Sequence, residues 1–390
     1  MTTRSTPHVA VVGGGPAGSA LAIVLARAGL PVTVLEGDGA PRAKIGECLS
    51  PGFGGLLEQL GVKQALSADG HLKAHGNRSV WGGESVVDED FIFRAQAEAW
   101  HLDRARFEHR IAVTAAEAGA RYCRGAHVMA CERRGSAFEL VFEDASAHAR
   151  RLVADFVVDA TGRRADLARG LGAERVRYDR LVAVASVLEG DPDRAVTDTF
   201  TLVESTPAGW WYSAALRGGR LAVAYMTDGD LLDRSALRAP VWWDALGCPP
   251  RTLDRVSRHH TRPHAAAPRV QVAGSARLDR IAGAGWMAVG DAAAAYDPLS
   301  SYGIGSALGA GYYAAHAIRD HLAGRADAME AYLYLMDKAY ANYLAVLHGT
   351  YRAEQRWPDA PFWARRHLDT YGLMPVRAGL DERQPEGSAA

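Results

Sequence analysis

Three glycines near the first residues have the spacing of a turn that binds a dinucleotide. Gly13, Gly15 and Gly18 fit the pattern G-x-G-x-x-G. The first glycine permits a tight turn, the second lets the backbone approach a pyrophosphate, and the third lets a helix pack closely on a strand. Glu36 follows 18 residues after Gly18, where a carboxylate accepts hydrogen bonds from ribose hydroxyls. The pattern predicts dinucleotide binding and leaves open whether the ligand is FAD or NAD.

The segments around these glycines have the periodicity of a strand, a helix and a second strand. Residues 8–12 are a short apolar run typical of a buried strand. Residues 19–28, rich in alanine and leucine, predict a helix that Gly29 ends, and residues 31–36 predict the next strand. A helix that begins directly at the glycine turn directs free backbone N–H groups at an anion. We therefore expect the βαβ unit of a doubly wound sheet.

The composition is that of a globular protein with two lobes. A chain of 390 residues exceeds the usual size of one domain. Apolar residues make up 48% and charged residues 23%, which is typical of folded proteins and excludes disorder as the main state. Because 44 basic residues balance 45 acidic ones, we expect no nucleic-acid partner that relies on bulk positive charge.

The sequence gives no sign of a metal site, an export signal or a membrane span. The four cysteines form no C-x-x-C pair, and the histidines in residues 259–264 have no zinc-ligand spacing. Free thiols are typical of a reducing cytoplasm, which is the location we expect. Residues 8–26 and 298–318 lack charged side chains, but glycines interrupt both stretches. We therefore expect no membrane partner.

Three further stretches decide between the dinucleotides. Residues 102–108 read L-D-R-A-R-F-E, and residues 156–163 read F-V-V-D-A-T-G-R. Residues 286–305 contain a buried G-D motif followed by D-P-L-S-S-Y-G-I-G. Together with the glycine turn, these stretches resemble the FAD-dependent monooxygenases of the aromatic-hydroxylase superfamily and the related flavin-dependent halogenases. The matching motifs follow in the family order and span residues 8–320.

This resemblance implies FAD as the cofactor and a role for each motif. In that superfamily the carboxylate of the G-D motif holds ribityl hydroxyls, and the Pro-to-Gly loop presents backbone amides near the flavin. The D-A-T-G segment lies near the cofactor, and the arginine of L-x-R-x-x-F-E contacts it. The candidate cofactor-binding residues are Gly13, Gly15, Pro16, Ala17, Gly18, Glu36, Arg42, Lys44, Glu47, Arg104, Val128, Asp159, Gly162, Asp291, Pro298, Gly303, Ile304 and Gly305.

One segment resembles halogenases in particular. Glu47 and Pro51 fit their G-E-x-x-x-P segment, and Lys73 follows 26 residues after Glu47. Halogenases carry a catalytic lysine near this place, which handles hypohalous acid, so Lys73 is the candidate catalytic residue. The alternative is a solvated loop lysine without a catalytic role, since lysine is mostly exposed in any fold.

Another segment points away from halogenation. The halogenase motif W-x-W-x-I-P is broken, because Tyr212, Ala214 and Ala215 stand where tryptophan, isoleucine and proline would be. We expect the small alanines to leave room for substrate near the flavin. The segment resembles maturases that oxidise a tryptophan in the precursor of quinone-cofactor enzymes. Packing in the core is the alternative explanation for these aromatic residues. The candidate substrate residues are Trp210, Trp211, Tyr212 and Tyr302.

These observations predict an α/β fold with a Rossmann-type (GR2-like) FAD-binding lobe, a β-rich substrate lobe and C-terminal helices. The expected FAD lobe is discontinuous. The expected boundaries are 1–75, 98–180 and 270–330 for the FAD lobe, 76–97 and 181–269 for the substrate lobe, 331–376 for the helices and 377–390 for a flexible tail.

The leading functional hypothesis is an FAD-dependent monooxygenase that uses O2 to hydroxylate a tryptophan-like aromatic substrate. The substrate is either a small molecule or a residue of a precursor protein or peptide. NADH, NADPH or a partner flavin reductase would reduce the flavin. The alternatives are a halogenase that uses reduced FAD from a partner, a reductase of the geranylgeranyl type, and a flavin-binding chaperone without turnover.

Overall fold

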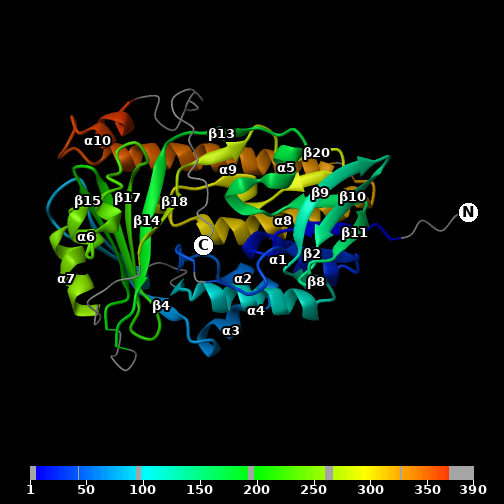
Figure 1. Ribbon diagram of the computed structural model, residues 1–390, viewed down its shortest axis with the longest axis horizontal. Helices are drawn as coiled ribbons and strands as arrows, with labels where there is room; N and C mark the ends of the chain where they lie inside the picture. Colours follow the sequence, from blue (N-terminus) through cyan, green and yellow to red (C-terminus); the bar gives the residue numbers. More distant parts are fainter. Residues whose placement is uncertain are drawn as a thin grey trace, which may run out of the picture.

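The protein consists of two lobes joined by a long helix along one side (Figure 1). The computed structural model describes residues 6–42, 44–93, 98–191, 197–259, 267–325 and 327–368. The expected tail at 377–390 and the last residues of the expected C-terminal helices, 369–376, lie outside these residues. In Figure 1 the larger antiparallel sheet lies at one end, and the glycine motif lies in the other lobe.

The first lobe is built on a mostly parallel sheet. Within the described residues the strand order is β20-β21-β12-β1-β2-β8, and only β20 runs antiparallel to its neighbour. The central strands are fully buried runs of mostly apolar residues, as expected for strands covered on both faces. The strands are β1 (Val9–Val12), β2 (Val32–Glu36), β8 (Arg121–Arg124), β12 (Phe156–Asp159), β20 (Ala282–Gly283) and β21 (Trp286–Ala288).

The second lobe is a mostly antiparallel sheet with the order β18-β14-β17-β16-β15-β5-β6 in the part of the chain that the structure describes. Only the β5–β15 pair is parallel. One face of this antiparallel sheet packs against α9 and α10, and the other packs against α6 and α7. The strands are β5 (Gly76–Val80), β6 (Val87–Asp90), β14 (Leu181–Leu188), β15 (Phe200–Thr206), β16 (Gly209–Ala215), β17 (Leu221–Asp228) and β18 (Arg269–Val272).

Helices and short strands surround the two sheets. The helices are α1 (Pro16–Arg27), α2 (Gly54–Leu60), α3 (Lys63–Ala68), α4 (Arg104–Glu117), α5 (Asp166–Gly170), α6 (Trp242–Ala245), α7 (Pro250–His259), α8 (Gly303–Leu322), α9 (Asp327–Arg352) and α10 (Pro361–Arg366), with 3-10 turns η1 (Phe91–Phe93), η2 (Gly162–Arg164), η3 (Ala236–Arg238), η4 (Gly290–Ala292) and η5 (Pro298–Ser300). The remaining strands are β3 (Cys48–Leu49), β4 (Leu72–Ala74), β7 (Ala99–His101), β9 (His127–Arg134), β10 (Ala137–Glu143), β11 (Ala149–Ala154), β13 (Arg175–Arg177), β19 (Ala276–Leu278) and β22 (Ala294–Ala295). None of the described helices is both long and apolar enough to cross a membrane.

The structure confirms the predicted α/β class, with a doubly wound sheet and a β-rich second lobe. Two strands that are distant in sequence, β5 and β15, pair within the second lobe. β18 also belongs to the antiparallel sheet, so the expected boundary at residue 270 runs through a strand of that sheet. Hydrophobic periodicity could not locate β18, because all four of its residues are exposed.

Helix α8 lies against α1 at a distance that only glycine permits. A Cβ atom built on Gly311 would lie 2.1 Å from the carbonyl oxygen of Ala17. We expect Gly311→Ala to push the helices apart and to lower the free energy of unfolding by about 1–3 kcal/mol. The matched control is Gly309→Ala on the same helix, where the nearest atom is 4.0 Å away. It should raise stability by up to about 1 kcal/mol. Equal effects in denaturant unfolding would contradict this assignment.

Candidate active site

A cavity of about 1130 Å³ lies between the two lobes. The walls come from the glycine turn, Arg42, the 44–48 segment, β9 and the loop before α8 on one side, and from β14, β16, β17 and β18 on the other. Most of the candidate residues meet here although they are far apart in sequence. Those lining the cavity are Gly13, Gly15, Pro16, Ala17, Glu36, Arg42, Lys44, Arg104, Val128, Tyr212, Gly162, Asp291, Pro298, Gly303 and Ile304.

The glycine turn offers a backbone cradle for a pyrophosphate. Gly13 has φ +104°, and a Cβ atom there would lie 2.2 Å from the carbonyl oxygen of Ala160. At Gly15 no described atom lies within 4 Å of a built Cβ, so the backbone faces open space. Gly15 precedes α1 and no described side chain caps its first amides. These N–H groups and the helix dipole fit the two phosphates of FAD.

Glu36 holds the turn as well as facing the cavity. Its Oε2 accepts a hydrogen bond from the Gly14 N–H at 2.5 Å, and its Oε1 accepts one from the Asp38 N–H at 2.8 Å. The hydroxyl of Tyr122 donates to the carbonyl oxygen of Gly14 at 2.7 Å. Sequence reasoning missed Tyr122, because it lies on β8 and no motif marks it. The contact of Glu36 with ribose hydroxyls stays a prediction.

A buried carboxylate, Glu108, orders the basic side of the cavity. It accepts hydrogen bonds from Arg104 Nη2 at 2.5 Å and from Lys44 Nζ at 2.7 Å. Burial raises the pKa of Glu108, but the charges of Arg104 and Lys44 outweigh it and hold this pKa below its usual range. Arg104 also donates from Nη1 to the carbonyl oxygen of Gly46, and its buried Nε has no partner among the described residues. Both cations are thus fixed at the wall, where they could contact an anionic cofactor.

Asp291 and the loop after it form the wall nearest to α8. The Asp291 side chain is one-third exposed, and its Oδ2 lies 3.5 Å from Nε of Arg163. The loop turns through η5 and Ser301, which has φ +54°, before α8 begins at Gly303. Asp291 therefore has acceptor capacity left for ribityl hydroxyls.

Four candidate cofactor residues lie behind the cavity wall. Asp159 is fully buried, and its carboxylate accepts hydrogen bonds from Thr161 and from the Ala168 N–H. A Cβ atom on Gly18 would lie 2.1 Å from the Gly13 oxygen, and one on Gly305 would lie 2.2 Å from the ring of Phe53. The fourth is Glu47. These positions hold the wall in place and do not line the cavity described here.

Tyr212 is the substrate candidate that reaches the cavity. Its hydroxyl donates to Glu47 Oε1 at 2.6 Å, which ties the ring on β16 to the 44–48 segment. Burial raises the pKa of Glu47 above its ordinary value, and it raises the pKa of Tyr212 as well. The Tyr212 phenol thus stays neutral and anchors the ring by a short hydrogen bond.

The other aromatic candidates are placed elsewhere. Alternation along β16 turns Trp211 to the opposite face, where it stacks on Trp242 at a ring distance of 5.8 Å. Trp210 is completely buried, and its Nε1 donates to the Tyr351 hydroxyl at 3.0 Å. Tyr302 is 44% exposed and packs edge-on against Tyr296. For the two tryptophans, core packing is therefore what the structure shows.

The expectation that small residues make room beside the flavin needs correction. Ala214 and Ala215 are completely buried and do not line the cavity. Ala214 is enclosed by the core cluster that also contains Trp210, and strand alternation turns Ala215 to the face opposite to Tyr212. The small residues that do line the cavity beside Tyr212 include Ala183 on β14 and Ala273 directly after β18.

Lys73 lies on β4, away from the cavity lining. Its side chain is exposed, and Nζ lies 5.7 Å from the centre of the Trp100 ring. Within the described residues, the lysine that does line the cavity is Lys44, which is paired with Glu108. The catalytic role of Lys73 stays a prediction.

Comparisons with known proteins agree with this geometry. Residues 6–217 match the FAD binding domain family. The chain is also 31% identical over 363 residues to LodB of Marinomonas mediterranea, assigned as an FAD-dependent oxidoreductase, and the match covers 92% of this chain and 96% of that protein. This chain belongs to the FAD-binding domain family. It is a flavin-dependent enzyme, an FAD-dependent oxidoreductase.

Two further proteins to which this flavoprotein is similar belong to the superfamily that the sequence motifs resemble. A tryptophan 2-halogenase of Chondromyces crocatus is 26% identical, with 94% of this chain and 72% of that protein covered. The solved structure of the peptidyl tryptophan dihydroxylase QhpG, essential for tryptophylquinone cofactor biogenesis, superposes with a TM-score of 0.76. It is 25% identical and covers 93% of this chain and 79% of that chain. The predicted superfamily is thereby confirmed.

Among the described residues of the flavoprotein, no three histidine, cysteine or carboxylate side chains are placed so that they could hold a metal ion. His260 and His264, which the sequence analysis considered as ligands, lie outside those residues. Sequence reasoning also gave no role to Asp297, which lines the cavity while being completely inaccessible to solvent. The signal was its place directly before Pro298.

Substitution of two aspartates should affect FAD binding and the stability of the fold separately. We expect Asp291→Ala to weaken FAD binding by about 1.5–3 kcal/mol, the scale of hydrogen bonds to a charged group, and to leave unfolding unchanged. The matched control is Asp159→Ala, which leaves buried donors unpaired and should lower the free energy of unfolding by about 2 kcal/mol or more. The ratio of bound FAD to protein and denaturant unfolding measure the two effects. A folded Asp291→Ala protein with full FAD occupancy would overturn the assignment of Asp291.

Proposed function

We propose that this flavoprotein is a monooxygenase that hydroxylates a tryptophan side chain presented by a precursor protein or peptide. The observation that carries the proposal is Tyr212, an aromatic ring that is fixed in the cavity wall opposite the flavin-binding motifs. A flat aromatic wall favours an aromatic substrate by stacking or edge contacts. The relatives that act on tryptophan, in free or peptidyl form, support this substrate class.

The residues of the chain would hold the cofactor and shield the reaction from water. The α1 amides and Gly15 would bind the pyrophosphate, and Asp291 would accept hydrogen bonds from the ribityl chain. Bound FAD, once reduced by NADH, NADPH or a partner reductase, would activate O2, of which one atom enters the ring and the other leaves as water. Apolar and aromatic side chains around Tyr212 exclude water from that place, which limits the wasteful loss of reducing equivalents. Examples on the antiparallel sheet are Ala183 and Met226.

Halogenation is the second candidate, because relatives with 24–26% identity are halogenases. In that reaction a lysine handles hypohalous acid in the substrate site. Here Lys73 is exposed on β4, and the lysine at the cavity wall, Lys44, is bound to Glu108 at 2.7 Å. Both placements favour direct oxygen transfer over halogenation.

The two reactions differ in their need for halide and for Lys73. We expect tryptophan-containing peptides to be hydroxylated with or without chloride or bromide. Lys73→Ala should leave the product unchanged and stability within about 0.5 kcal/mol, because the side chain is exposed. Lys338→Ala is the matched control for removal of one surface lysine. Mass spectrometry of peptides and free indoles identifies the product. A halogenated product that disappears in Lys73→Ala alone would replace the hydroxylase by the halogenase.

A further inference from the structure

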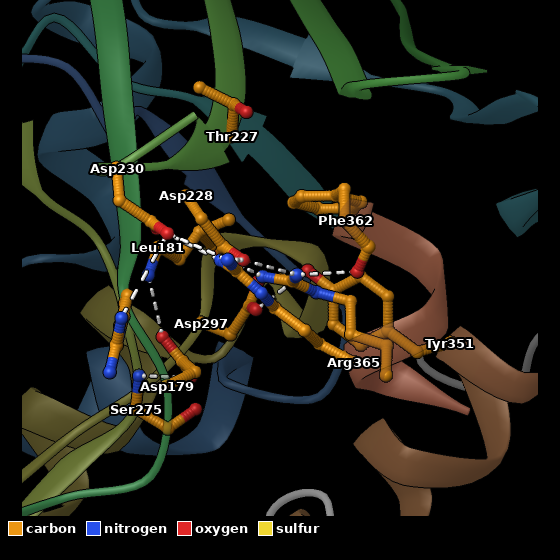
Figure 2. Close-up of polar contacts among 12 residues, drawn as sticks. Asp179, Leu181, Thr227, Asp228, Asp230, Ser275, Asp297, Tyr351, Phe362 and Arg365 are labelled. Carbon is orange, nitrogen blue, oxygen red and sulfur yellow. Dashed lines mark hydrogen bonds and ion pairs between the residues drawn. The ribbon is translucent and has the colours of Figure 1, made fainter. Parts of the chain in front are cut away.

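Figure 2 shows a cluster of buried carboxyl groups and their polar contacts. Asp179 lies between β13 and β14, Asp228 is the last residue of β17, and Asp297 lies in the loop before α8. They meet the side chains of α10 and Tyr351 of α9. Asp297 is the member that also lines the cavity. The cluster therefore connects the flavin-side loop with the antiparallel sheet and the C-terminal helices.

The charges within this cluster do not balance. Among the described residues, the completely buried cation of the cluster is Arg366, which binds Asp228 through Nη1 and Nη2. Arg365 is 38% exposed and is shared by Asp228 and Asp230. Asp179 and Asp297 therefore have no ion pair of their own within the described contacts. Two carboxylates that are buried this close cannot both remain charged at low cost.

The hydrogen bonds show which of the two carboxyl groups can accept a proton. Both oxygens of Asp179 accept from backbone N–H groups, those of Leu181 and Ser275, each at 2.9 Å. An amide can only donate, so it favours a charged Asp179. Asp297 accepts the Leu299 N–H at Oδ1 and the Tyr351 hydroxyl at Oδ2, both at 2.8 Å. A hydroxyl can donate or accept, so Tyr351 tolerates both forms of Asp297.

We propose that Asp297 is the proton-holding residue of the cofactor cavity, whose side chain takes up one proton when the bound flavin is reduced and releases it on reoxidation. The proposal rests on FAD binding in this cavity and not on the hydroxylation of an aromatic substrate. In the balanced step, two electrons from the reductant and one proton enter the flavin. A second proton from solvent converts the Asp297 carboxylate to the acid.

Electrostatics at Asp297 support this step. Burial and the neighbouring Asp179 raise the pKa of Asp297 from its ordinary value to about 7, against the lowering effects of the Leu299 amide, Tyr351 and Arg366. The other ionisable group that faces it is Tyr343, whose hydroxyl accepts a hydrogen bond from the Asp297 N–H at 2.6 Å and shares a second one with the hydroxyl of Ser275. Burial raises the pKa of Tyr343, so its hydroxyl stays neutral. A reduced flavin adds negative charge to the cavity, and a nearby negative charge raises a carboxyl pKa further. At a pH between the pKa of Asp297 beside oxidised flavin and its higher pKa beside reduced flavin, reduction must draw in a proton.

The test is the midpoint potential of bound FAD between pH 6 and 9. One proton taken up per two electrons changes the potential of a two-electron couple by 29.6 mV per pH unit. Above about pH 7 the midpoint potential of the wild-type protein should fall more steeply than that of Asp297→Asn. The difference should be one such step of 29.6 mV per pH unit. Asn keeps the shape of the side chain and cannot take up the proton. Below that pH both proteins should show the same slope, because the Asp297 acid already holds its proton in the oxidised state.

Two further variants separate this role from a structural one. Asp179→Asn is the matched control, because Asp179 is also a buried aspartate and lies outside the cavity lining. It removes a neighbouring charge, so the extra proton should remain while its onset moves to lower pH. Tyr351→Phe removes a donor to the charged form, so the onset should move to higher pH. These two opposite shifts test the proposal even where Asp297→Asn does not fold. Equal slopes in wild type and Asp297→Asn, or an onset that both controls leave in place, would overturn it.

Discussion

The whole site depends on contacts between backbones that leave no room for a side chain. Gly13 lies against the carbonyl group of Ala160, which joins the first turn to the D-A-T-G segment. A Cβ on Gly290 would lie 2.7 Å from Cβ of Ala17, and one on Gly311 would lie 2.1 Å from the oxygen of the same residue. The glycine turn, the G-D motif and α8 thus converge on the first residues of α1. Packing at this density fixes the cavity wall before any ligand binds.

The second lobe supplies what the first lobe lacks, a closed side to the cavity. The parallel sheet ends in backbone amides and a few polar groups. These suit a cofactor but would by themselves leave a flavin ring open to water. The antiparallel sheet covers that opening with Tyr212 and small apolar residues from three strands. The hydrogen bond between Tyr212 and Glu47 crosses from one lobe to the other, so the closed side keeps its distance from the flavin-side wall.

Local patterns of sequence were enough to predict the first lobe. Its central strands are buried on both faces and its turns require glycine, so each of these features is visible within about 30 residues. The second lobe was harder, because its function depends on which face each residue presents. Trp210, Trp211 and Tyr212 look equivalent in the sequence, yet only Tyr212 reaches the cavity. No motif marks β18, because its residues are exposed. No motif links Glu47 with Tyr212 either, although a hydrogen bond joins them across the two lobes.

Tertiary structure also explains why a motif residue need not touch the ligand. Asp159 belongs to a segment that borders the cavity, but its carboxylate binds Thr161 and the Ala168 amide and so shapes the turn. Asp291 has the same charge and a similar place at the end of a neighbouring strand, yet it remains partly exposed to the cavity. Burial and the number of committed hydrogen bonds, more than residue type, separate a group that holds the wall from one that is free to bind. By the same criterion Asp297 is intermediate, since it is buried and bonded while one of its partners is a hydroxyl that can reverse its role.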